Sequence, residues 1–436
     1  MRINIIFQDI KNKKFFEVFI ISFLLLTLLF GRAFMGIAIF NYRLGEYLVA
    51  LSLLLFIYLI YSQKFYFFTL LLISFLISNL INYGFTFSTY TFKASAYIWT
   101  IGFVLIGVLL FSQHLFSKKI YLIIFNLLPA LTYLFFTLFR PQFLLNFFTL
   151  ISDNANTLKP SDVFSLLVFV NVINKLYFDE KTFLILFSST SAFFLPLLLA
   201  LSRGAVLGYI IYMIIELYLS RKMIFSNRKR ATALILLTLS TLYFSSLIVS
   251  KVDFYSINQA NELPSLKAAL GEIAEVKNTF DTDRYLYLNE GRLYSSDGTM
   301  NWRLDIWQDV IYDLNIKNQI YFGYGFNEII PIMLDGYQPG RLGRDGLNEN
   351  VHNIFFTVLA RGGLIQLIAY SLFIFFGLTK IISINNRYEI IKIVIPFYLV
   401  SFFDVSMDGV QFPFIFYILI GYIFMVEKTK YNKVHL

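Results

Sequence analysis

The 436-residue sequence contains no cysteine, few charged residues and only three histidines. The absence of cysteine excludes disulfide bonds, thiolate metal ligands and a cysteine nucleophile. Charged residues make up 14% of the chain and hydrophobic residues 58%, with a mean hydropathy of +0.68. A soluble globular domain carries about 25% charged residues. The composition therefore excludes a soluble domain and indicates a protein embedded in a lipid bilayer.

The sequence also lacks the short motifs of several enzyme classes. No HExxH, GxSxG or P-loop pattern occurs. The pair Gly323 and Gly325 lacks the third glycine of a dinucleotide-binding loop, so these residues are expected to form a turn. We expect no metal ion and no cofactor.

Long apolar runs recur from end to end, and each can cross a hydrocarbon core of ~30 Å as a helix. The expected fold class is all-α, a polytopic membrane protein with about 12 transmembrane helices and one large extracytoplasmic loop. The first run lacks a small-residue cleavage site, so we interpret it as an uncleaved span. The expected spans are roughly 16–31, 44–62, 65–82, 95–112, 119–138, 161–177, 182–201, 204–220, 231–250, 353–379, 388–406 and 410–427.

Lysines and arginines indicate the orientation of these spans. With a cytoplasmic N-terminus, basic residues concentrate in the expected cytoplasmic segments, which is the positive-inside bias of membrane proteins. Both termini are then cytoplasmic, and the net charge of +9 does not point to nucleic acid. The short outer loops hold only Arg32, Arg43, Lys93, Arg140, Lys159 and Arg203.

The chain divides into three parts: residues 1–250 with transmembrane helices 1–9, a large periplasmic or extracytoplasmic loop at 251–351, and residues 352–436 with helices 10–12 and a cytoplasmic tail. Loops of this length are functional or disordered. This one keeps Trp302, Trp307 and many tyrosines, and its pattern predicts helices at 265–280 and 301–315, so we expect an ordered functional cap. No internal repeat is evident.

Arg203 lies in a tight outer turn, between Ser202 and Gly204. An arginine near hydrocarbon costs free energy. Two readings remain open: an interfacial arginine whose side chain reaches to water, or a fixed set of donors for an anionic group such as a lipid-linked phosphate.

Residues 301–314, "NWRLDIWQDVIYDL", predict an amphipathic helix. Arg303 and Trp307 are four residues apart and share a face, which Val310 and Leu314 continue. Here too there are two readings: a surface helix with an Arg–Trp pair, or a helix that presents Arg303 to the membrane mouth as a second phosphate ligand.

His352 and Asn353 stand where polar loop gives way to an apolar helix. The histidine is either a structural residue at a helix end or a base for a sugar hydroxyl near neutral pH. The paired glycines Gly362 and Gly363 leave a smooth surface for close helix packing.

Carboxylates give weaker signals. Asp281 and Asp283 match a metal-binding pattern of nucleotide-sugar transferases by only three residues, and metal binding there is not favoured. Asp404 and Asp408 flank the turn between the last two spans, where a solvated turn is favoured over a role in orienting an arginine or histidine.

Four motifs follow in order: "SRGA" at 202–205, "RLDIW" at 303–307, "FGYGF" at 322–326 and "HNIFFTVLARGGLI" at 352–365. Together they resemble the bacterial O-antigen ligase and O-antigen polymerase superfamily, whose pattern is an SRG-type turn, R-x-x-x-W, G-x-G, and H-N followed by glycines. The resemblance covers about residues 190–425. "RGGLIQL" at 361–367 departs from the G-[IL]-[IL]-G of many members, which affects helix packing more than chemistry.

The resemblance implies a membrane glycosyltransferase that performs inverting, metal-independent glycosyl transfer at the outer side of the bacterial inner membrane. Its donor would be an undecaprenyl diphosphate-linked oligosaccharide. Arg203 and Arg303 would bind the diphosphate, His352 would be the catalytic residue that activates or orients the acceptor hydroxyl, and Asn353 and Trp307 would support the site.

We expect a repeat-unit polymerase for a cell-surface polysaccharide such as O-antigen or capsule, because the chain is idiosyncratic outside the motifs. Its partners would be lipid-linked donor and acceptor, the lipid bilayer and a chain-length regulator protein. The alternative within the superfamily is an O-antigen ligase that transfers the polymer to lipid A core. The alternative of another class is a flippase, which would require ionisable residues inside several spans, and the expected spans are nearly free of them.

Overall fold

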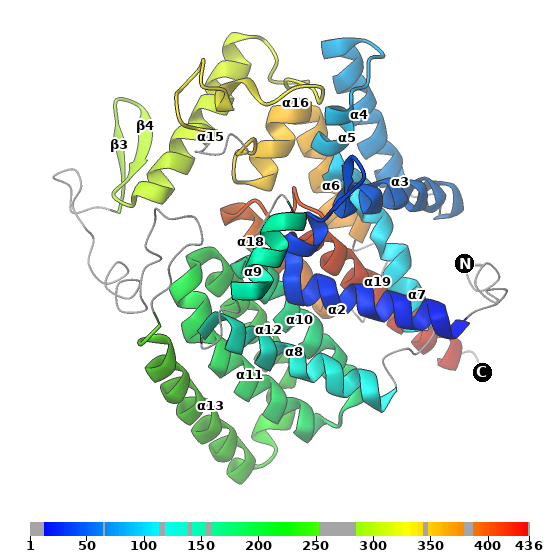
Figure 1. Ribbon diagram of the computed structural model, residues 1–436, viewed down its shortest axis with the longest axis vertical. Coiled ribbons are helices and arrows are strands. Elements are labelled where there is room, and N and C mark those ends of the chain that lie inside the picture. The colour runs from blue at the N-terminus through cyan, green and yellow to red at the C-terminus, as the bar shows by residue number, and fades with distance from the viewer. Residues whose placement is uncertain are drawn as a thin grey trace.

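The structure, a computed structural model, describes residues 13–63, 66–112, 118–137, 142–152, 159–252, 285–342, 348–378 and 387–434. These residues form an all-α membrane protein with little sheet (Figure 1). The α-helices are α2 (Lys13–Met35), α3 (Leu44–Gln63), α4 (Tyr66–Tyr83), α5 (Thr89–Ala94), α6 (Ala96–Trp99), α7 (Val104–Ser112), α8 (Lys119–Thr137), α9 (Gln142–Ile151), α10 (Pro160–Tyr177), α11 (Glu180–Leu201), α12 (Arg203–Phe225), α13 (Arg228–Val249), α15 (Gly298–Ile316), α16 (Ile354–Leu372), α18 (Arg387–Phe403) and α19 (Gln411–Val434).

Short elements complete the fold. Two antiparallel hairpins pair β1 (Ala38–Ile39) with β2 (Tyr42–Arg43) and β3 (Leu286–Asn289) with β4 (Arg292–Ser295). In the second hairpin Leu286 lies opposite Ser295. Three short helical turns are η1 (Thr100–Phe103), η3 (Pro331–Met333) and the π-helical η4 (Phe373–Gly377).

Six helices in the described part of the chain are long and apolar enough to cross a bilayer, and four shorter apolar helices accompany them. These ten helices coincide with expected spans; the count of twelve spans stays a prediction. The six are Glu17–Met35, Leu44–Tyr61, Glu180–Leu201, Arg203–Phe225, Arg228–Val249 and Ile354–Gly377.

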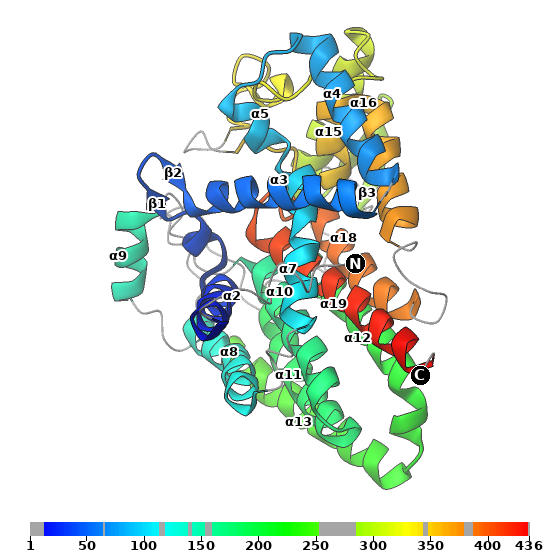
Figure 2. The ribbon, with the colours of Figure 1, turned by 90° about the vertical axis from the view of Figure 1, so that its right-hand side faces the viewer.

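Helix α10 lies at the centre of the helical body, in contact with α2, α8, α11, α12, α18 and α19 (Figure 2). Every side chain from Ser161 to Asn174 is buried. The two asparagines that interrupt its apolar run have partners on other helices: Asn171 donates to the Tyr209 hydroxyl at 3.3 Å, and Asn174 exchanges amide hydrogen bonds of 2.9 Å with Asn126. Paired polar groups of this kind hold helices together in lipid.

A second body, formed by α15, α16, α4, α5 and the chain between α15 and residue 342, lies at one end of the molecule (Figures 1 and 2). Helix α15 confirms the helix predicted at 301–315, while the one predicted at 265–280 lies outside the described residues. Backbone hydrogen bonds join the "FGYGF" turn to α16: Tyr324 donates to the Ala360 carbonyl at 2.7 Å, and Gly325 to that of Arg361 at 2.9 Å.

Gly363 makes this junction possible. It interrupts α16 with φ +67°, and a Cβ at this position would lie 2.2 Å from the carbonyl carbon of Tyr321. Only glycine allows both this conformation and this approach. The glycine pair therefore serves packing, as the sequence indicated.

Four charged side chains form an ion-pair network between α10, α12 and α18. Glu216 pairs with Lys175 at 2.7 Å and with Lys392 at 2.8 Å, and Glu216 and Lys392 are each 1% exposed. Glu389 contacts the same two lysines, at 3.0 and 2.5 Å. These residues lie near the ends of the expected spans 161–177, 204–220 and 388–406, and their matched charges offset the cost of burial.

Lys392→Met should lower the free energy of unfolding by about 3 kcal/mol, because it leaves Glu216 buried with one of its two cations. Thermal unfolding of the detergent-solubilised protein measures the loss. The double variant Glu216→Gln/Lys392→Met should recover part of it. Lys181→Met, at an exposed lysine on α11, is the control; equal stability of Lys392→Met and this control would contradict the assigned role.

Candidate functional site

Helix α15 carries two of the predicted site residues and packs as its sequence pattern requires. Asp297 caps its start, because its Oδ1 accepts a hydrogen bond of 2.7 Å from the Met300 amide. Trp307, Val310 and Leu314 are buried, which confirms the predicted face.

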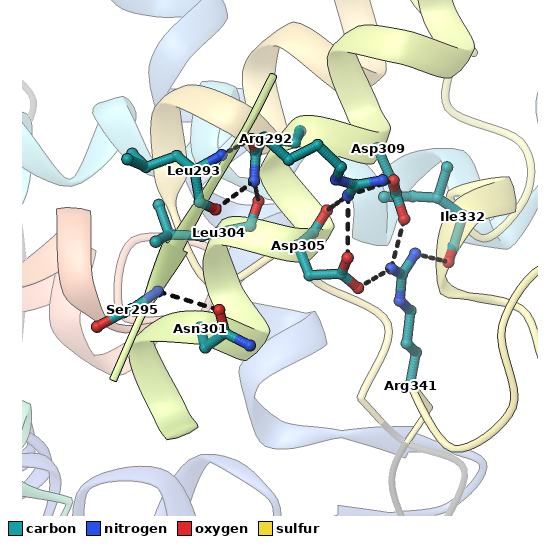
Figure 3. A network of polar contacts seen from close by, with 10 residues as sticks. Arg292, Leu293, Ser295, Asn301, Leu304, Asp305, Asp309, Ile332 and Arg341 are labelled. Atoms are coloured by element: carbon teal, nitrogen blue, oxygen red, sulfur yellow. Dashed lines mark hydrogen bonds and ion pairs between the residues drawn. The ribbon is translucent and has the colours of Figure 1, made fainter. Parts of the chain in front are cut away.

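The opposite side of α15 is fixed by charge (Figure 3). Asp305 and Asp309 each bind both Arg292 of β4 and Arg341. Arg341 is 2% exposed and also donates to the Ile332 carbonyl at 3.0 Å. Two cations meet two carboxylates in this partly buried cluster, so its charges are balanced. It ties the helix to the hairpin and to the chain at 332–341.

Trp307 joins α15 to the chain directly before the histidine. Its Nε1 donates to the Val351 carbonyl at 2.8 Å. Its ring stacks on Phe356 with centroids 5.1 Å apart and an interplanar angle of 6°, and it meets Phe402 edge-on. Trp307 therefore sets the position of residue 351 relative to α15.

His352 has φ +56°, an uncommon conformation for a residue other than glycine. The next residue, Asn353, is the N-cap of α16 and accepts from the Phe355 amide at 2.8 Å. The ring of Trp302, from α15, meets the imidazole edge-on with centroids 5.0 Å apart. The imidazole is thus held from the helix it precedes and from α15.

Burial, and after it the positive charge of Arg303, lowers the pKa of His352 to about 4. The imidazole is therefore neutral at pH 7 and can accept a proton. Its Nε2 lies 2.7 Å from Asn348 Oδ1.

Arg203 begins α12, whose N-cap is Ser202. Its Nη1 donates to Asp297 Oδ2 at 2.8 Å, and the arginine side chain is 40% exposed. Asp297 thus caps α15 with one oxygen and binds Arg203 of α12 with the other. The same carboxylate raises the pKa of Arg303, so it lies close enough to act on both predicted arginines.

Arg303 is half-buried, and its buried Nε has no hydrogen-bond partner among the described residues. Burial lowers its pKa, although Asp404 and Asp297 oppose the shift. A guanidinium keeps its charge at neutral pH even so. Buried donors without partners are rare, and this one is suited to an incoming anion.

Three further charged residues act electrostatically on His352. Beyond burial and Arg303, Asp404 raises the pKa of His352, and Lys159 and Arg32 lower it. Lys159 is the N-cap residue of α10, and Arg32 lies in the last turn of α2. Burial also lowers the pKa of Lys159.

The turn between α18 and α19 is less exposed than the sequence indicated. The expectation of a solvated turn is wrong for Asp408, whose Oδ1 is buried and whose Oδ2 accepts from the Thr357 hydroxyl at 3.2 Å. Burial raises the pKa of Asp408 to about 6. This carboxyl anchors the turn on the first turn of α16, so Asp404 is held near the histidine.

Helix α5 fixes the other side of the segment before His352. The Tyr90 hydroxyl donates to Glu349 Oε2 at 2.9 Å and accepts from Arg361 Nη2 at 2.9 Å. Lys93 pairs with the same Glu349 oxygen at 2.8 Å. The N-terminal half of the chain thus helps to position the residues next to Asn348.

The structure therefore gathers all five residues singled out from the sequence. Arg303 lowers the pKa of His352, and Asp297 acts on Arg303 and forms an ion pair with Arg203. Trp307 and Asn353 hold the backbone on either side of the histidine. Sequence reasoning missed Asp297, Asn348, Lys159, Arg32 and the contribution of Asp404. Arg32 and Lys159 could have been found, because they are basic residues of the expected outer loops, against the general charge bias.

No group of three metal-ligating side chains occurs in the described part of the chain. Asp281 and Asp283 lie outside that part.

Residues 188–371 match a family model described as O-antigen ligase. The matched stretch is less than half of the chain, and it runs from α11 into α16 with Arg203, Arg303 and His352 inside it. It confirms the resemblance to the O-antigen ligase and polymerase superfamily. No match was found among curated proteins or among solved structures.

Asp297→Asn should change stability by less than about 1 kcal/mol, because asparagine is an equally good N-cap and the lost ion pair is partly exposed. Asp297→Ala should cost about 1 kcal/mol more, the usual loss of a cap. Thermal unfolding compares the two variants. Equal losses would mean that the ion pair with Arg203, and not the cap, dominates at this position.

Proposed function

Because this chain carries a membrane domain of the O-antigen ligase and polymerase type, we propose that it transfers a saccharide from undecaprenyl diphosphate to a sugar hydroxyl. The acceptor is a second lipid-linked repeat unit, so the protein is a repeat-unit polymerase for a cell-surface polysaccharide. The observation that carries the proposal is a half-buried histidine, neutral at pH 7, and an arginine close enough to lower its pKa whose buried Nε has no partner among the described residues.

The two arginines fit a diphosphate leaving group. Arg203 and Arg303 come from different helices; Asp297 forms an ion pair with the first and acts electrostatically on the second. Guanidinium groups bind phosphate oxygens through several directed hydrogen bonds. When the glycosidic C–O bond breaks, its electron pair moves to the diphosphate, and the two cations stabilise the charge that develops there.

The histidine fits the acceptor. His352 is neutral at working pH, so it can take the proton of the attacking hydroxyl while that oxygen bonds to the anomeric carbon. Attack opposite the leaving group inverts the configuration at this carbon. Nothing in this sequence of steps calls on a metal ion.

The topology completes the proposal. We propose about 12 spans in the bacterial inner membrane, both termini in the cytoplasm, and an extracytoplasmic loop over residues 251–351 that covers the site on the outer face. The positive-inside bias supports this orientation. A lipid-linked donor would then reach the arginines from within the bilayer. A chain-length regulator protein would bind elsewhere on the protein, away from the reacting residues.

A second candidate is the ligase reaction, which the description of the matched family favours. The two reactions share a donor and differ in acceptor. A flippase is the candidate of another class, and it would need ionisable residues near the middle of several spans. The ion pairs around Glu216 lie near the ends of the expected spans.

Purified protein should lengthen undecaprenyl diphosphate-linked repeat units in the presence of EDTA. Transfer onto lipid A core without lengthening would replace the polymerase by the ligase. Movement of the lipid across proteoliposomes with no new glycosidic bond would replace both by a flippase.

His352→Ala should lower turnover by about 10²–10⁴-fold, the usual contribution of general acid–base catalysis, with donor binding little changed. Arg203→Ala and Arg303→Ala should weaken donor binding by roughly 10–100-fold, as expected for charge-assisted hydrogen bonds worth ~1.5–3 kcal/mol. Arg221→Ala is the matched control, because Arg221 is exposed near the far end of the helix that Arg203 begins. Full activity of His352→Ala would refute the catalytic role.

A further inference from the structure

We propose that Asn348 is a positioning residue that fixes His352 as the Nε2–H tautomer, so that Nδ1 is the atom that accepts a proton. The tautomer follows from the hydrogen bonds alone. That Nδ1 takes the proton of the acceptor hydroxyl rests on the proposed function.

The orientation of the Asn348 amide is determined by its other contact. Its Nδ2 donates to the Arg341 carbonyl at 2.9 Å, and its backbone amide donates to the Leu342 carbonyl at 2.8 Å. Turning the amide over would place Oδ1 against the Arg341 carbonyl, and two acceptors repel each other. Oδ1 therefore faces His352.

An amide oxygen can only accept a hydrogen bond. The contact of 2.7 Å between Asn348 Oδ1 and His352 Nε2 therefore requires the hydrogen on Nε2. A neutral imidazole carries one N–H. Nδ1 is left with its lone pair, and it makes no hydrogen bond with a residue that the structure describes.

The imidazole is also held against turning over. Trp307 holds the Val351 carbonyl, Asn353 caps α16, and the left-handed backbone of His352 fixes the direction in which the side chain leaves the chain. The edge-on ring of Trp302 packs against the imidazole. Exchange of the two ring nitrogens would have to break the packing and the bond to Asn348 together.

The carbonyl that orients Asn348 belongs to Arg341, whose side chain is held by two ion pairs and a hydrogen bond. The Arg341 side chain is 2% exposed, and both carboxylates of the network in Figure 3 bind it. The network thus reaches the histidine through a chain of three groups: the Arg341 carbonyl, the Asn348 amide and the imidazole. The balanced cluster on α15 therefore also helps to orient the Asn348 amide that bonds to the imidazole.

The proton balance is complete with these groups. The hydroxyl proton moves to Nδ1 as the oxygen bonds to the anomeric carbon, and the imidazolium keeps its Nε2–H bond to Asn348. The proton then leaves to water. A neutral amide partner, unlike a carboxylate, stabilises the imidazolium little, which agrees with the low pKa of His352 near 4.

Nitrogen-15 NMR of the full-length protein in lipid, labelled at histidine, reads the tautomer directly, and His352→Gln identifies the signal. The wild type should show Nε2–H at pH 7, and Asn348→Ala should show a mixture of both tautomers. Asn315→Ala, at an exposed asparagine of α15, is the control and should leave the spectrum unchanged. An Nδ1–H signal in the wild type, or an unchanged signal in Asn348→Ala, would overturn the proposal.

The variant Asn348→Asp keeps an acceptor for Nε2–H and serves if Asn348→Ala does not fold. Its carboxylate favours the protonated imidazole and so raises the pKa of His352. Because the neutral base is then lost at a higher pH, the acidic limb of the kcat/KM profile should move up from about pH 4 by about one unit or more, toward the ordinary histidine value of ~6.5. An unmoved limb would contradict the positioning role.

Activity separates this proposal from the one on which it rests. Asn348→Ala should lower kcat about tenfold or more with KM little changed, since general-base catalysis contributes 10²–10⁴-fold. If the tautomer depends on Asn348 but His352→Ala is fully active, the proposed function fails and the tautomer assignment stands. If the wild type is Nδ1–H while His352→Ala is inactive, the assignment fails and the function stands.

Discussion

The hydrogen bond from the Trp307 indole to the Val351 carbonyl is the contact on which the site depends. It joins a helix of the polar loop to the first residues of a membrane helix, and the histidine follows directly after it. Together with the Trp302 ring against the imidazole, this contact fixes α15 relative to the start of α16, and so Arg303 relative to His352. Stacking of the same indole on Phe356 adds apolar burial to the polar bond, so the junction is held in both ways.

Two groups of charged side chains lie around this junction. The cluster of Arg292 and Arg341 with Asp305 and Asp309 is neutral and serves structure. Near His352 the positive charges of Arg303, Lys159 and Arg32 meet the carboxylates of Asp404, Asp297 and Asp162. Burial, and after it the charge of Arg303, keeps the histidine neutral. The arginine that would bind an anion therefore also favours the neutral form of the base.

Much of this could be predicted from the sequence, and the remainder could not for a physical reason. Hydrophobic run length predicted the helices, and 3.6-residue periodicity predicted the buried face of α15 with Trp307, because both signals are local. The motif order predicted that Arg203, Arg303 and His352 belong together. Asp297 and Asn348 were missed because their roles depend on contacts with residues of other elements. A carboxylate or an amide in a loop has no periodic sequence pattern that would predict such contacts. Asp408 was misjudged because a turn between two spans is ordinarily solvated, whereas this one packs on Thr357.

The most direct test of the account is the pKa of His352 with and without undecaprenyl diphosphate, from nitrogen-15 NMR titration of the labelled protein in lipid. In the proposed site a diphosphate lies next to Arg303, whose positive charge lowers that pKa. Bound diphosphate should therefore raise the pKa of His352 above about 4, and uncharged undecaprenol should leave it unchanged. A pKa that is the same with diphosphate bound as without it would contradict the account, because the anion and the histidine would then not share a site.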